Sequence, residues 1–481
     1  MNMNTKDKLG KKTLLDILKV SSSNLLFLIS GILVGFLLPK IIGKIDYGYY
    51  KTFTLYAGYV GLLHFGFSDG IYLIYGGKKF EELNKSKFRS LFIFLFILEA
   101  LILFFGIVLA VVFLTGDMRF VFICIFGYMF SANLTNYFQI ISQITGRFNE
   151  LSLRTVFQSL LTIVSIFVLW ILNKFFSFKI EYKIYIIIFL TINYILTFWY
   201  IFTYKELIIG EKESNSFKYY LSFIKIGFPL LISNLCSSLI LNLDRQFVNL
   251  LFDVETYAVY AFAYNMLSLI TTAMSAVATV LYPSLKRVDE NGLQLIYDKL
   301  MKIILTLVFL LIIVYFPLCW FVNWFLPSYS ESLVIFRIIL PGLAVSSPVT
   351  IIMHNYYKSS NNEVLYFLKS MCILIISIIA NLIAYLIFKT TISISISSIF
   401  VMFIWYLIIE RYFIKKYNVE WIRNYLYIVV MTALFYLITM LSIWWMAMLI
   451  YLLAFIVVSL FFYRDDAKYV YNKIKDMRKK I

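Results

Sequence analysis

One arginine, Arg245, stands inside a long apolar segment of this sequence, directly after Asp244. The segment, residues 226–251, exceeds the roughly 20 residues that an α-helix needs to cross a hydrocarbon core of about 30 Å. An arginine at the centre of such a helix costs on the order of 2.5 to 3.5 kcal/mol on insertion scales. We therefore expect polar groups or water around Arg245, in a place where its guanidinium could pair with an anion.

Helical periodicity groups the polar residues of this segment on one face. At 100° per residue they form a stripe about 80° wide, made of Asn234, Ser238, Asn242, Arg245 and Asn249. The next apolar segment has a hydroxyl stripe of similar width, made of Tyr257, Tyr260, Tyr264, Ser268, Thr271 and Ser275. Two such stripes on neighbouring helices predict the wall of a wet cavity.

The partner of Asp244 is expected on another helix, because residues i and i+1 do not face each other on one helix. For Arg245 two interpretations remain open. It is either the principal contact for an anionic cargo or one half of a structural salt bridge with an acid such as Glu99 or Asp69.

Composition places these segments in a membrane. The chain has 481 residues, of which 62% are hydrophobic and 14% charged, whereas soluble globules are about 45 to 50% apolar. Apolar runs of this length predict helices, since the strands of a membrane barrel need only about 10 residues. The sequence therefore predicts an all-α polytopic membrane protein.

Hydropathy predicts about fourteen transmembrane helices. Their approximate ranges are 20–42, 49–76, 90–114, 120–145, 155–173, 184–203, 226–251, 258–284, 303–326, 333–357, 370–388, 394–412, 425–443 and 445–463. The basic segment before residue 20 resembles a signal sequence, but its apolar run is long and lacks a cleavage site, which favours a retained first span.

Lysine and arginine predict the orientation. All but ten of the 43 basic residues fall in the connections that are cytoplasmic if both termini are cytoplasmic. The net charge of +17 is spread over all of these connections, which favours topology and contact with anionic lipids over binding of nucleic acid.

The connections are short and carry no signature of an enzyme. None exceeds about 25 residues, and the sequence lacks a phosphate-binding GxxxxGK[ST] loop, an HExxH motif and a GxSxG motif. The four cysteines lie in apolar spans without CxxC spacing, which favours packing over metal or disulfide chemistry. The two histidines, His64 and His354, favour hydrogen-bonded packing over a proton relay. We therefore predict no enzymatic activity, no metal and no cofactor.

Further polar groups at membrane depth have two interpretations each. The amides Asn133, Asn136, Gln139 and Gln143 of the fourth span lie within about 120° of one face. They could line a cavity or link helices by hydrogen bonds. The acids Glu99, Asp69 and Asp244 are candidates for binding a coupling ion, H⁺ or Na⁺, and each could instead pair with a basic residue.

The chain also looks duplicated. Tyr47-Gly48-Tyr49-Tyr50 and Tyr257-Ala258-Val259-Tyr260 are 210 residues apart, each at the outer start of a long span. Parallel repeats of this kind predict two six-helix bundles around a central cavity, residues 1–210 and 211–412. Residues 413–481 would add two transmembrane helices and a basic tail.

Three segments of the chain resemble one family. LLPKIIGKIDYGYY, DRQFVNLLFDVETYAVYAFA and YPSLKR are similar to the polysaccharide-repeat flippases, the Wzx-type proteins of the multidrug/oligosaccharidyl-lipid/polysaccharide superfamily. The resemblance implies alternating access and a cargo of oligosaccharide repeat units on polyprenyl, usually undecaprenyl, diphosphate. It also implies a location in the bacterial cytoplasmic (inner) membrane and transport from the cytoplasmic to the outer leaflet.

For such a cargo, the basic and amide residues at membrane depth become predicted substrate contacts. Arg245 would bind the diphosphate, and Lys51 and Arg337 would receive or release it at the outer mouth, unless they only snorkel to the headgroups. The other predicted substrate contacts are Asn234, Asn242, Asn249, Asn136, Gln139 and Gln143, of which the last three would face the sugars.

Two other functions compete with the flippase. A drug or metabolite antiporter of the same superfamily would have the same spans and cavity but would need acidic residues for cationic substrates. A membrane-embedded polysaccharide polymerase would need a large outside loop, which this sequence lacks.

Overall fold

A computed structural model describes residues 3–285, 290–360, 362–417, 419 and 421–464, and throughout these residues the regular structure is helical. Twelve stretches among them are long and apolar enough to cross a membrane. The predicted basic tail and the Lys286-Arg287 pair lie outside the described residues. The chain is an all-α polytopic membrane protein, as the sequence predicts.

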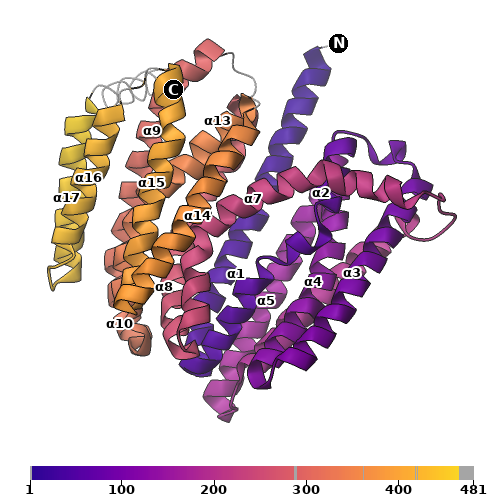
Figure 1. Cartoon of the computed structure of the whole chain (residues 1–481), viewed down its shortest axis with the longest axis horizontal. Coiled ribbons are helices and arrows are strands. Elements are labelled where there is room, and N and C mark those ends of the chain that lie inside the picture. Colours follow the sequence, from indigo (N-terminus) through magenta and orange to yellow (C-terminus); the bar gives the residue numbers. More distant parts are fainter. Residues whose placement is uncertain (1–2, 286–289, 361, 418, 420, 465–481) are drawn as a thin grey trace. The chain divides into compact units, whose positions relative to one another are not determined.

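The helices follow the predicted spans in order, although the second, ninth and tenth spans are each divided into several helical segments (Figure 1). The first seven are α1 (Met3–Ala57), α2 (Phe67–Tyr75), α3 (Lys85–Phe113), α4 (Gly116–Ile144), α5 (Phe148–Phe176), α6 (Tyr182–Thr203) and α7 (Phe217–Leu251). The others are α8 (Val254–Leu285), α9 (Glu290–Leu311), α10 (Tyr315–Phe325), α11 (Ser332–Ile339), α12 (Leu343–Ser347), α13 (His354–Ser359), α14 (Glu363–Phe388), α15 (Thr391–Tyr417), α16 (Trp421–Ile438) and α17 (Trp444–Phe462).

Contacts divide the chain into two compact units. The first unit consists of residues 1–235 and 252–261, and the second of residues 236–251 and 262–481. Within the second unit, α16 and α17 pair with each other and both contact α9. The domain boundaries at residues 210 and 412 and the cytoplasmic location of both termini remain predictions.

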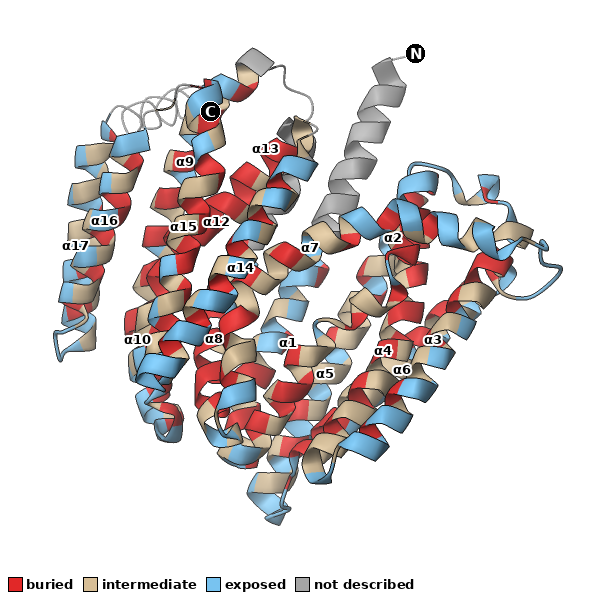
Figure 2. Cartoon of the chain, viewed as in Figure 1, coloured by how far each residue is buried: buried red, intermediate tan, exposed pale blue. Residues whose placement is uncertain are grey.

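Large apolar side chains are exposed along α3 and α17 (Figure 2). On α3 they include Leu101, Phe104, Phe105, Val108, Leu109 and Val112. On α17 they include Leu449, Leu453, Ile456, Val457, Leu460 and Phe461. Apolar surface on this scale is stable against lipid and not against water, so these faces are suited to contact the hydrocarbon core.

Glycine breaks the helix between the first two predicted spans and again within the second. Gly43 has non-helical dihedral angles (φ 75°, ψ 173°) inside α1 and separates the first span from the start of the second. The second span, predicted as one helix over 49–76, is instead the end of α1, the short 3₁₀ helix η1 (Val60–His64) and α2. Gly66, at φ +82°, is the residue that precedes α2, and a side chain there would also overlap Gly227 and Phe228 of α7.

The two repeated turns contact each other within the first unit. A Cβ atom on Gly48 would overlap the carbonyl oxygen of Val254, so only glycine allows this approach. Lys44 Nζ lies 3.3 Å from Glu255 Oε1, and the Tyr257 hydroxyl donates to the Lys51 carbonyl oxygen at 3.4 Å.

The connection between α7 and α8 is fixed by a capping residue. Asp253 accepts hydrogen bonds from the backbone N–H of Thr256 at 2.9 Å and from its hydroxyl at 2.7 Å. These bonds favour the ionised carboxylate and lower the pKa of Asp253. The cap begins α8 and thereby sets which of its side chains face α7.

Candidate functional site

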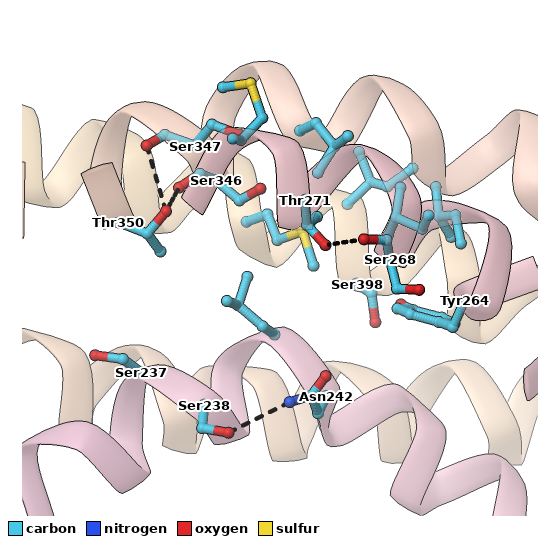
Figure 3. A pocket seen from close by; sticks show the side chains of 18 of the residues that line it. Ser237, Ser238, Asn242, Tyr264, Ser268, Thr271, Ser346, Ser347, Thr350 and Ser398 are labelled. Carbon is cyan, nitrogen blue, oxygen red and sulfur yellow. Dashed lines mark hydrogen bonds between the residues drawn. The ribbon is translucent and has the colours of Figure 1, made fainter. Parts of the chain in front are cut away.

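A pocket of about 460 Å³ lies within the second unit, among α7, α8, α15 and the helices that follow α11. Its polar lining is Ser237, Ser238, Asn242, Arg245, Tyr264, Ser268, Thr271, Ser346, Ser347, Thr350 and Ser398. Figure 3 shows the labelled side chains of α7 across the pocket from those of α8 and of the 346–350 segment. The remaining lining is aliphatic, methionine or glycine.

Both predicted stripes contribute to this wall. Ser238, Asn242 and Arg245 come from the stripe on α7. Tyr264, Ser268 and Thr271 come from the stripe on α8 and complete this side of the pocket. The structure thus brings the central parts of the two stripes together.

Arg245 supplies the only side-chain charge of the described pocket lining. Its guanidinium carbon lies 4.7 Å from the centroid of the Tyr264 ring, and its Nε is buried without a hydrogen-bond partner. Among the described residues of the second unit, no acidic oxygen lies within ion-pair distance of Arg245. A salt bridge to Glu99 or Asp69, which belong to the first unit, remains a prediction, and within the second unit the guanidinium is available to an anion.

Asp244 makes its contacts elsewhere, as predicted. It is buried, with 2% of its surface exposed, and accepts a hydrogen bond from the hydroxyl of Tyr264 on α8. Its Oδ1 also accepts from the backbone N–H of Arg245 at 2.8 Å. The hydroxyl of Tyr264 therefore binds the carboxylate of Asp244, and the ring of Tyr264 packs against the guanidinium of Arg245.

Some polar side chains of the pocket donate hydrogen bonds within the protein. Ser268 donates to the Asn265 carbonyl at 2.6 Å, and Thr350 donates to the Ser346 carbonyl at 3.0 Å. Asn242 Nδ2 donates to Ser238 Oγ at 3.3 Å. The oxygens of Ser268 and Thr350 keep lone pairs that can accept hydrogen bonds from a ligand.

One wall of the pocket was not expected from the sequence. The tenth span was predicted as one helix over 333–357, but it is broken into α11, the 3₁₀ turn η6 (Leu340–Gly342), α12, the π-helical turn η7 (Pro348–Met353) and α13. Pro341 and Pro348 each lack a backbone N–H, which explains the change of helix type at both places. The Pro-Gly and Ser-Ser-Pro sequences within an apolar span were the signal that could have located this wall.

Several predicted residues lie outside the pocket lining. Asn234 is exposed, and Asn249 is partly buried further along α7. Tyr257 and Tyr260 are buried in the first unit. The side chain of Ser275 lies outside the described part of the structure.

The two other predicted diphosphate contacts, Lys51 and Arg337, are not part of the pocket lining. The Lys51 ammonium lies over the rings of Tyr47 and Tyr50, at 5.2 and 5.6 Å. Arg337, in the last turn of α11, lies near Tyr315 and Tyr436.

In the first unit, Glu99 is fully buried on α3. Its Oε1 accepts a hydrogen bond from Asn133 Nδ2 at 3.0 Å, and its Oε2 has no partner. Asn133 also donates to the Val60 carbonyl at 3.2 Å, so this amide links helices and holds the acid. Asp69 lies 4.0 Å from Nε2 of His64.

The other amides of α4 are less constrained. Asn136 is partly buried, Gln139 lies beside the hydroxyl of Tyr200, and Gln143 is exposed. A role for these amides in binding sugar remains a prediction.

Comparison with known proteins identifies the fold. No family model matches the sequence. No curated protein matches it either. Among solved structures, the chain is similar to the lipid II flippase MurJ in an inward closed conformation, with a TM-score of 0.72 and 15% identity over 94% of this chain and 99% of that one.

Multidrug transporters are similar as well. An inward-facing multidrug resistance MATE family transporter of the MOP superfamily has a TM-score of 0.58 and 15% identity, covering 82% of this chain and 96% of its own. A MATE protein in complex with MaD3S has a TM-score of 0.53 and 13% identity, covering 84% and 97%. The chain therefore has the fold of these MurJ and MATE structures.

Proposed function

We propose that this protein is a flippase for oligosaccharide repeat units linked to polyprenyl diphosphate. It would move them from the cytoplasmic to the outer leaflet by alternating access, for the synthesis of a cell-surface polysaccharide. The observation that carries the proposal is a pocket with one unpaired arginine among oxygens that accept hydrogen bonds.

The chemistry of the lining matches the two ends of such a cargo. A diphosphate carries negative charge and only accepts hydrogen bonds, so it requires the guanidinium of Arg245. Sugar hydroxyls donate hydrogen bonds, which Ser268 and Thr350 can accept. The volume of about 460 Å³ is in the range of small-molecule pockets, so it suits the diphosphate and an adjoining sugar and not the whole lipid.

A cationic drug fits this pocket less well, because the guanidinium of Arg245 would repel it. The alternative, a MATE-like antiporter, is supported by the shared fold and by the buried Glu99. An anionic metabolite would satisfy Arg245, but it would not explain the many hydroxyl groups.

The test is complementation in the host after deletion of the gene. Lipid-linked intermediates should accumulate in the inner leaflet, and the wild-type gene should restore glycan export. Arg245→Ala should lower export roughly tenfold to a hundredfold, since a charge-assisted hydrogen bond contributes about 1.5 to 3 kcal/mol. Arg245→Lys should keep part of the export, because an ammonium still binds phosphate as a point charge.

The matched control is Arg119→Ala. Arg119 donates to the carbonyl of Leu114, next to its own helix, and should be dispensable for export. Lys51→Gln and Arg337→Gln should lower export less than Arg245→Ala, because neither residue lines the pocket. Unchanged glycan export after deletion would remove the proposal, and full export by well-expressed Arg245→Ala would remove the role of this arginine.

A further inference from the structure

Glu410, on α15, is a buried acid that the sequence analysis did not single out. It is 0% exposed, and neither of its carboxyl oxygens has a hydrogen-bond partner among the described residues. Glu99, the other glutamate that is fully buried among the described residues, has at least the amide of Asn133. An ionised carboxylate without compensation in such a place would be strongly destabilising.

Three tyrosines from three helices surround this carboxyl group. Tyr406 of α15 and Tyr425 of α16 have their hydroxyls beside it, although neither forms a hydrogen bond of normal geometry. Tyr297 of α9 is close enough to interact with it electrostatically. The hydroxyls of Tyr297 and Tyr406 are also buried without partners among the described residues.

The basic side chains on the surrounding helices are engaged or exposed. On α9, Lys302 pairs with Asp298 at 2.6 Å. On α14, Lys369 donates to the Tyr357 hydroxyl at 3.0 Å.

The basic side chains of α16 and α15 are likewise engaged or exposed. On α16, the guanidinium of Arg423 lies 5.4 Å from the centroid of the Tyr463 ring. On α15 itself, Arg411 and Lys415 are exposed. None of the ion pairs among the described residues includes Glu410.

Several buried oxygens that converge without a counter-charge suit a small cation. We propose that Glu410 and the hydroxyls of Tyr297, Tyr406 and Tyr425 form a binding site for a monovalent cation, either a proton or an alkali metal ion. One carboxylate neutralises one positive charge, and phenol oxygens supply further neutral ligands to an alkali ion. A proton would instead sit on one carboxyl oxygen and be donated to a phenol oxygen.

The site joins helices that are distant in sequence. α16 contacts α9. The ring of Tyr406 on α15 lies 5.5 Å from the ring of Tyr425 on α16. An occupied site would therefore hold α16 against the rest of the second unit. This role does not depend on the identity of the cargo.

The experiment uses the purified full-length chain in detergent. Thermal unfolding is followed at fixed pH and ionic strength while N-methylglucamine chloride is replaced by sodium or potassium chloride. For an alkali site, the wild-type midpoint should rise by about 2 to 5 °C at saturation, and Glu410→Gln should abolish the rise. Glu181→Gln, which changes an exposed acid, should behave as the wild type.

A pH series in N-methylglucamine chloride distinguishes the proton. If the ion is a proton, the wild type should lose stability as the pH rises and its carboxyl must ionise, and Glu410→Gln should lack this component. Hydrogen exchange of residues 421–438 should slow when the site is occupied and should not respond in Glu410→Gln.

A second variant covers the case in which Glu410→Gln does not fold. Tyr425→Phe keeps the acid and removes one ligand, so the ion concentration or the pH at half-effect should shift by about tenfold, or one pH unit. The proposal would be overturned if Glu410→Gln responded to the ions and to pH as the wild type does. If only Tyr425→Phe folds, a response identical to that of the wild type would overturn it. Neither result bears on glycan export, which tests the proposed function separately.

Discussion

Tyr264 organises the charged pair of the second unit. Its hydroxyl donates to Asp244, and its ring lies under the guanidinium of Arg245. Two adjacent residues of opposite charge on one helix thus share one aromatic partner on the next helix without pairing with each other. This arrangement keeps the guanidinium at the pocket without neutralising it.

Tyr264→Phe should separate these two interactions. The ring and its contact with Arg245 remain, but the buried carboxylate of Asp244 loses a hydrogen bond, which costs about 1 to 3 kcal/mol. We expect a lower thermal midpoint in detergent and reduced export, with the protein still inserted. Tyr194→Phe, which removes a hydroxyl bonded to the Gly127 carbonyl at 2.9 Å in the first unit, is the control. Wild-type stability in Tyr264→Phe would show that another group satisfies Asp244.

Sequence periodicity located most of one wall of the pocket. The 100° step placed Ser238, Asn242 and Arg245 on one face because α7 is a regular helix over these residues. The same periodicity also placed Asn234 and Asn249 on this face, but neither residue lines the pocket. Periodicity gives the direction of a side chain around the helix axis and not the extent of a cavity along that axis. It also did not identify Glu410, because periodicity does not show that this acid is buried among other helices.

At the scale of helices, breaks in the spans position the polar groups. The tenth span changes from α to 3₁₀ to α to π and back to α, with proline at both irregular turns. A long apolar run reads as one helix by hydropathy, because hydropathy is blind to helix type. The irregular backbone faces a pocket, which is where a membrane protein can tolerate it.

Pro348→Ala tests the functional value of the π-helical turn. Alanine restores a backbone N–H and favours a regular α-helix, which would rotate Thr350 relative to Ser346 and Ser347. We expect normal or higher thermal stability together with lower export. Pro327→Ala, at the start of the 3₁₀ turn η5 (Pro327–Tyr329) and away from the pocket, should leave export unchanged. Equal export in both variants would mean that the turn serves packing alone.

Gly48→Ala tests the contact between the two repeated turns. The added methyl group would overlap the Val254 carbonyl, and overpacking of this kind costs about 1 to 3 kcal/mol. We expect a lower thermal midpoint and impaired export. The control is Gly31→Ala, because a Cβ at Gly31 meets no atom within 4 Å. If both variants unfold at the same temperature, the turns do not need this close approach.

At the scale of the molecule, composition alone was sufficient for the class of fold. Long apolar runs and a low charged fraction allow little except a helical bundle in lipid, and the chain indeed has the fold of MurJ and MATE structures at 15% identity. The grouping of helices was harder to predict, because contacts that define the units involve residues far apart in sequence. α7, for example, belongs to one unit up to Leu235 and to the other from Cys236.

The distribution of lysine and arginine predicts the orientation of the chain in the membrane. If both termini are cytoplasmic, the linker around Lys212 faces the cytoplasm, whereas Ser330 and Lys389 face outward. All three residues can report on topology, since Lys212 and Lys389 are exposed and Ser330 adjoins the exposed Glu331. The test uses a variant whose four native cysteines are replaced by serine and introduces a single cysteine at one of these positions at a time. A membrane-impermeant maleimide should then modify only the cysteines on the accessible side of the membrane.

In intact cells, cysteines at positions 330 and 389 should react and a cysteine at position 212 should not. In inverted membrane vesicles the pattern should reverse. The reverse pattern in intact cells would place the termini outside. That result would contradict the orientation assigned from lysine and arginine. It would also contradict the proposed direction of transport, because both depend on which face of the protein meets the cytoplasm.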